Sequence, residues 1–196
     1  GTLLKHIKEK DTVFVVFVSD GYSSRDEELH RDKACKDLMK TIGAEDPIFF
    51  NFPDNQLDKI PRLKIIKEIE KIKKEIEPNI IYTHYSDDLN IDHRIVSDCA
   101  HTAFRPQPGE QVRAILQFEV LSSTEWTFLK PFSPNLFVDI ADYLEEKIEL
   151  LKFYKEEMKD PPHSRSIDNV RNLALFRGST IGRGAAEAFI VSRLIL

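Results

Sequence analysis

The stretch "NIIYTHYSDDLNIDHR" (79–94) decides the fold class and points to a site. Its start, residues 79–83, is a short β-branched and aromatic run that predicts a buried strand. Residues 83–94 then hold two histidines, three aspartates, an asparagine and an arginine. Such a segment after an apolar strand is either a solvated loop or a place where His and Asp side chains converge on a cation. Spacing alone leaves both interpretations open, because a metal needs three or four ligands.

Strands alternate with helices outward from this stretch. The run "TVFVVFV" (12–18) is apolar throughout, which is typical of a strand covered on both faces. Residues 61–75 carry apolar side chains at three- and four-residue spacing and predict an amphipathic helix. The pattern predicts an α/β fold with a Rossmann-like, mostly parallel sheet and helices on both faces. The other expected elements are helices at 2–9, 29–42, 92–104 and 141–158, strands at 47–52, 112–121 and 135–140, and a mixed segment at 166–193.

Length and charge bound the class of protein. A chain of 196 residues suits one domain, 1–196. The net charge of -5 argues against nucleic acid as a partner, and no apolar stretch reaches the ~20 residues that span a bilayer. Cys35 and Cys99 are far apart in helix-like surroundings, which favours reduced thiols and a cytoplasmic location. Composition leaves open whether the chain forms a homo-oligomer.

Two polar loops are expected at the carboxyl ends of strands, where open α/β sheets bind ligands. They are "SDGYSSR" (19–25) and the segment 83–94. Within the second, Asp92 is a sensible helix N-cap. His93 would then lie in the first helical turn, where the helix dipole favours the neutral imidazole that binds metals. For a single histidine, a buried and hydrogen-bonded structural role is the alternative, and His84 is expected to be structural.

The order of several motifs resembles the LmbE/PIG-L family of metal-dependent N-deacetylases. The segment "DLNIDHR" (88–94) is similar to its Asp-x-His-x-Asp-His signature, with Asn at the third place. Further similar stretches are "VSDGYSSR" (18–25), "FPDNQLD" (52–58), "FEVLSSTEW" (118–126), "SPNLFVDI" (133–140), "HSRSID" (163–168) and "RGSTIGRGAAEAF" (177–189).

The resemblance implies a Zn²⁺-dependent hydrolysis of the N-acetyl group of an amino sugar or its conjugate. His93 would be a metal ligand. Asn90 would replace a histidine that donates to the oxyanion, and Asp92 would steer the neighbouring histidine. The candidates for binding the small-molecule amino-sugar substrate are Arg25, Arg31, His163 and Arg165.

The family's first signature, Pro/Ala-His-Pro-Asp-Asp-Glu, supplies two ligands and the base but does not occur in the sequence. We favour a preceding segment that also holds a first strand, which would lie between the strands at 12–18 and 79–83. Otherwise those two strands would pair directly. The alternatives are a non-catalytic carbohydrate- or nucleotide-binding relative, or new ligands among Asp20, Asp87 and Asp88.

Overall fold

The computed structural model describes residues 1–21, 23 and 31–196, except the side chain of Arg31. The chain divides into two compact units. The first comprises Gly1–Asn51 and Phe137–Ala188, and the second comprises Phe52–Leu136 and Phe189–Leu196. The expectation of a single domain, 1–196, stays a prediction. No helix among the described residues combines the length and the apolar character needed to cross a bilayer.

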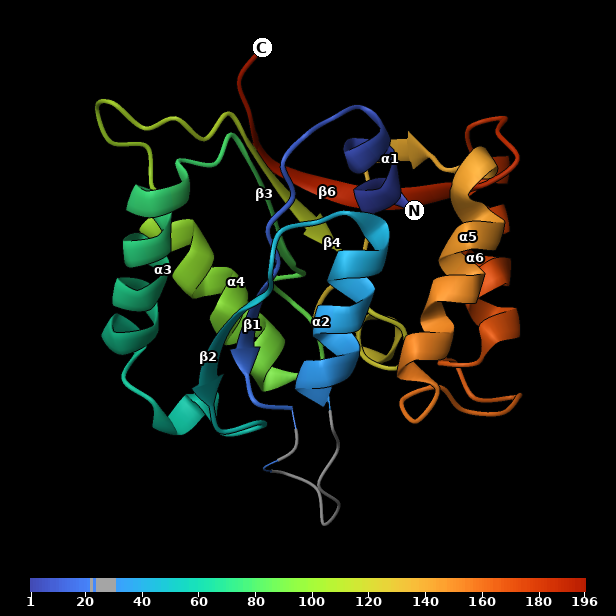
Figure 1. Ribbon diagram of the computed structural model, residues 1–196, viewed down its shortest axis with the longest axis horizontal. Coiled ribbons are helices and arrows are strands. Elements are labelled where there is room, and N and C mark those ends of the chain that lie inside the picture. Colours follow the sequence, from blue (N-terminus) through green and yellow to red (C-terminus); the bar gives the residue numbers. More distant parts are fainter. Residues whose placement is uncertain (22, 24–30) are drawn as a thin grey trace. The chain divides into compact units, whose positions relative to one another are not determined.

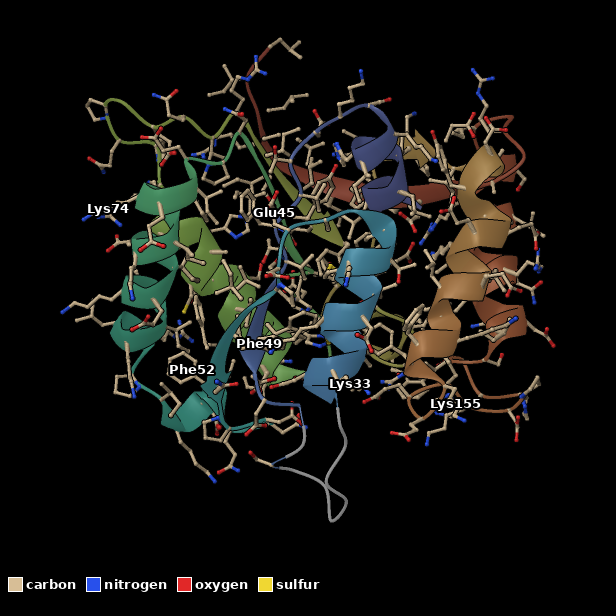
Figure 2. The ribbon with its side chains drawn as sticks, viewed as in Figure 1. Lys33, Glu45, Phe49, Phe52, Lys74 and Lys155 are labelled. Carbon is tan, nitrogen blue, oxygen red and sulfur yellow. The ribbon has the colours of Figure 1, made fainter. Side chains whose placement is uncertain are left out.

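The first unit contains a two-stranded sheet, β1–β2, and most of the helices near the two ends of the chain. The aromatic rings of Phe17 on β1 and Phe49 on β2 stack with 5.2 Å between centroids, and Phe49 is labelled in Figure 2. α5 and α6 pack against each other, side by side in Figure 1. The elements are α1 (Thr2–Lys8), β1 (Val16–Ser19), α2 (Arg31–Ile42), β2 (Ile48–Phe52), β5 (Leu136–Asp139), α5 (Leu144–Leu150) and α6 (Ile167–Ser179), with short 3-10 turns at Ala141–Tyr143 and Leu151–Tyr154.

In the second unit one helix packs on a strand of the four-stranded sheet, and a second helix packs on the first. Its elements are the 3-10 turn η1 (Leu57–Lys59), α3 (Arg62–Ile76), β3 (Ile80–His84), α4 (Ile91–Ala103), β4 (Ala114–Phe118), the 3-10 turn η2 (Thr124–Trp126) and β6 (Ala186–Leu194), whose first residues belong to the first unit. α3 packs on α4, and Ile65 and Cys99 on these helices are fully buried. Burying an Ile side chain contributes about 1.5–3 kcal/mol, so this contact holds α4 firmly.

The predicted α/β class is confirmed, and the four-stranded sheet is mixed. The four-stranded sheet has the order β3-β4-β6-β5, in which β3 and β4 pair in parallel. β6 pairs antiparallel to β4. A Rossmann-like, mostly parallel sheet is therefore not shown. The strand β6 was not predicted, because residues 186–194 were included in the mixed segment at 166–193. The helix ends at Ser179, and a turn with Gly182 at positive φ precedes the strand.

β1 and β3 belong to different sheets. The alternative that the strands at 12–18 and 79–83 pair directly is therefore wrong. The helix expected at 141–158 is also shorter, since only Leu144–Leu150 is α-helical. Tertiary contact overrides the helical pattern beyond Leu150, because the Tyr154 hydroxyl in the following 3-10 turn donates to Cys35 Sγ on α2 at 3.2 Å.

Candidate functional site

Asn90 begins the helix that carries the candidate site. Its backbone is extended, and its Oδ1 accepts a hydrogen bond from the backbone N–H of Asp92 at 2.8 Å. Asn90 is therefore the N-cap of α4, and the prediction that Asp92 caps it is wrong. Since capping requires the amide oxygen, the Asn90 Nδ2 group points elsewhere, toward Asn55 Oδ1 at 3.4 Å. The Nδ2 amide group, which is the hydrogen-bond donor of this side chain, therefore lies outside the helix cap.

Asp88 lies in the β3–α4 loop and its side chain is fully buried. Its carboxylate accepts hydrogen bonds from the Asn90 N–H at 2.9 Å, from His93 Nδ1 at 3.1 Å, and from the hydroxyls of Ser123 and Thr124. Burial alone would raise the pKa of the Asp88 carboxyl, but these donors outweigh it and lower the pKa to about 2. The carboxylate therefore stays ionised, with both oxygens engaged.

His93 lies in the first turn of α4 with its side chain one-fifth exposed. Because Nδ1 faces an ionised carboxylate, the neutral ring carries its proton on Nδ1. The lone pair is then on Nε2. This is the arrangement in which a histidine is ready to bind a metal, since the carboxylate fixes both the tautomer and the orientation of the ring.

A second imidazole covers the face of His93. The ring of His84, the last residue of β3, stacks on it with 4.2 Å between centroids and 21° between planes. Burial, together with the nearby His93, lowers the pKa of His84 to about 3. His84 is therefore neutral at physiological pH.

Asp92 points away from this hydrogen-bond network. Its buried carboxylate accepts from the backbone N–H of Leu57 at 3.1 Å and from that of Asn55. Burial raises the pKa of the Asp92 carboxyl. Asp92 thus holds the turn of the "FPDNQLD" segment against α4, whereas Asp88 forms the hydrogen bond to His93. The sequence pattern predicted both segments but gave no signal that they touch.

Ser123 and Thr124 also belong to the site, although the sequence pattern did not predict this. They lie in the "FEVLSSTEW" segment, and their hydroxyls donate to Asp88. A further hydrogen bond holds this region to the β3–α4 loop, since the Thr127 hydroxyl donates to the backbone oxygen of Asp87 at 2.5 Å. The family resemblance was the only sequence signal for this segment, because a contact over 35 residues leaves no periodicity.

The proposed substrate-binding residues are untested. Arg25 and the side chain of Arg31 lie outside the described residues. His163 and Arg165 belong to the first unit, whereas His93 belongs to the second. His163 Nδ1 accepts from the backbone N–H of Arg165 at 3.0 Å, and the Arg165 guanidinium pairs with Glu157 at 3.0 Å.

The described residues around His93 do not make a complete zinc site. A catalytic zinc takes three protein ligands, and His93 is the one oriented for that role. Within residues 1–21, 23 and 31–196, the group of three that lies close enough to hold an ion is His6, Glu9 and Asp11, on and after α1. The alternative ligands Asp20, Asp87 and Asp88 stay a prediction, although Asp88 already accepts from His93, Asn90, Ser123 and Thr124.

The fold is that of LmbE-like deacetylases. The structure superposes on N,N'-diacetylchitobiose deacetylase from Pyrococcus horikoshii with a TM-score of 0.76 at 20% identity, over 98% of this chain and 77% of that one. It superposes on the conserved protein TT1542 from Thermus thermophilus with a TM-score of 0.76 at 18% identity, over 100% and 88% of the two chains. The zinc inhibited form of teicoplanin deacetylase gives 0.72 at 14% identity, over 97% and 92%.

The sequence assigns the family directly. Residues 1–104 match the family model described as PIG-L, GlcNAc-PI de-N-acetylase. The chain belongs to this family, and the resemblance in the order of its motifs is confirmed.

Proposed function

We propose that the protein is a zinc-dependent N-deacetylase that hydrolyses the N-acetyl group of an amino sugar or its conjugate. The observation that carries the proposal is the orientation of His93, whose Nδ1 is held by Asp88 so that Nε2 is left to bind a metal. A bound zinc ion would supply a Lewis acid for the acetyl carbonyl and for water. The names of the similar structures support an acetylated sugar as the substrate.

Asn90 is the proposed oxyanion donor. Its Oδ1 is used by the helix cap, so its Nδ2 group can donate to an oxygen that gains negative charge during amide hydrolysis. Removing one such donor typically costs a factor of about 10²–10³ in rate. Asn90 donates without being able to transfer a proton, so proton transfer in this enzyme must use another group.

The proposal requires two more metal ligands and a general base, which the described residues around His93 do not provide. Arg25, Arg31, His163 and Arg165 remain our candidates for binding the hydroxyl groups of the sugar. Asp92 supports the site by fixing the turn at Leu57 beside the helix cap.

The experiment measures acetate release from N-acetylglucosamine and from N,N'-diacetylchitobiose by the complete protein. We expect release that stops on chelation, returns on adding Zn²⁺, and is abolished in His93→Ala. The matched control is His101→Ala on the same helix, whose ring contacts the Ser97 carbonyl instead of Asp88. Release that persists after chelation and in His93→Ala would contradict the proposal.

A second function is favoured by one observation, namely that the described residues bring a single oriented ligand to the site. In that case the protein is a non-catalytic carbohydrate- or nucleotide-binding relative that keeps the fold. It would bind no stoichiometric zinc, and its affinity for sugar would be the same in His93→Ala.

A further inference from the structure

His84 occupies a position between two rings. It is the last residue of β3, and its cross-strand partner in the parallel pair is Phe118, the last residue of β4. The His84 and Phe118 rings lie 4.8 Å apart at 51°, and on another side the His84 ring stacks on His93. The imidazole of His84 thus connects the end of the sheet with the first turn of α4.

Ring contacts, and not a hydrogen bond at Nδ1, hold the His84 side chain in place. His84 Nδ1 is buried and has no hydrogen-bond partner among the described residues. An unpaired buried polar atom costs about 1–3 kcal/mol, whereas a Phe ring would offer the same flat surface without that cost. The contact with His93 therefore depends on the flat ring of residue 84 and not on a hydrogen bond from its Nδ1.

Asp88 and Ser123 contact only the Nδ1 edge of the His93 ring. Contacts at Nδ1 alone, from Asp88 at 3.1 Å and Ser123 Oγ at 3.4 Å, allow the ring plane to turn, because the terminal torsion of histidine is broad. A flat ring at 4.2 Å, nearly parallel to His93, removes that remaining freedom. The edge contact and the face contact together define where Nε2 points.

We propose that His84 is a positioning residue, which fixes the plane of the His93 imidazole by ring stacking and so aims Nε2 at the metal. The inference rests on the proposed function only in giving His93 the role of a ligand. It adds a residue outside the "DLNIDHR" signature to the group that prepares the site before any metal binds.

The test compares His84→Phe, which keeps a flat ring, with His84→Leu and His84→Gln, which remove it. The control is Tyr82→Leu on the same strand, which removes a ring that packs on Phe189. The first readout is the set of ¹⁵N shifts of the His93 imidazole in metal-free protein, which report its tautomer and its exchange between orientations. The second is zinc affinity measured against a competing chelator.

We expect one ordered Nδ1–H form of His93 in wild type, in His84→Phe and in Tyr82→Leu. In His84→Leu and His84→Gln the signals should broaden or report mixed tautomers, with zinc affinity lower by about tenfold. The proposal is overturned if the Leu and Gln variants keep the ordered form, or if the Phe variant loses it to the same extent. If wild type binds no zinc, the proposed function fails while the NMR comparison still decides the role of His84.

Discussion

Asp88 and His93 face each other from the loop before α4 and from its first turn, with 3.1 Å between Oδ1 and Nδ1. The same carboxylate accepts from Ser123 and Thr124, which lie 35 and 36 residues further along the chain. One buried group therefore orients the candidate ligand and fastens a distant segment beside it.

The first prediction concerns Asp88→Asn. The amide would be a weaker acceptor for His93 Nδ1 and would bring N–H donors to the hydroxyls that now donate to it. We expect zinc affinity to fall by about 10–100-fold. Asp87→Asn, next along the chain, is the control. Titration against a chelator measures the change, and an affinity like that of wild type would show that the contact does not prepare the ligand.

The second prediction separates two roles of Asn90. Asn90→Asp keeps an oxygen for the helix cap but loses the amide donor, so stability should be retained while kcat/KM falls by about 100-fold. Asn90→Ala should show the same loss of activity and, in addition, be less stable by about 1 kcal/mol. Denaturant unfolding and steady-state kinetics measure the two effects. Full activity in Asn90→Asp would rule out the oxyanion role.

The third prediction concerns the acceptor at Asp92. In Asp92→Ala the buried N–H of Leu57 loses its partner, and we expect a loss of about 1–3 kcal/mol in the free energy of unfolding. Asp92→Asn keeps an oxygen at that place and should retain both fold and activity. A variant Asp92→Asn that folds like wild type but is inactive would instead assign Asp92 a direct part in the reaction.

The fourth prediction is a pH dependence in the first unit. Burial would raise the pKa of Glu187, but the Lys147 ammonium and the hydrogen bonds from Lys147 and the Thr2 N–H lower it below the usual 4.5. The folded state thus keeps this carboxylate ionised while the unfolded state takes up a proton. The stability it contributes is present above pH 4.5 and is lost as the pH falls below that value, by about 1.4 kcal/mol per pH unit.

Urea unfolding between pH 3 and 6 checks this prediction. Glu187→Gln should remove this part of the acid destabilisation, whereas Glu149→Gln, at a site two-thirds exposed, should leave it in place. An identical acid slope in wild type and Glu187→Gln would contradict the assignment.

The sequence predicted those parts of the fold that rest on local periodicity. The helix expected at 61–75 is Arg62–Ile76, and the strand expected at 79–83 is Ile80–His84. Both have side-chain patterns with one dominant period. β6 was missed because its short apolar run follows a long helical segment, so local composition gave two competing signals.

The site was predictable in position but not in its contacts. His93 and Asn90 were identified from the signature, and the structure places them in one helical turn. Two good cap residues, Asn90 and Asp92, stand two places apart, and only tertiary contact with Leu57 decides which one caps the helix. The family resemblance implied that Asp92 steers His93, whereas the folded loop brings Asp88 to Nδ1.

Zinc content is the most direct test of the central claim that His93 binds the catalytic metal. The measurement is metal per chain, by elemental analysis after dialysis, for the complete wild-type protein, His93→Ala and His101→Ala. The account predicts one zinc ion per chain in wild type and in His101→Ala, and a large loss in His93→Ala. Zinc absent from wild type, or retained in full by His93→Ala, would contradict it.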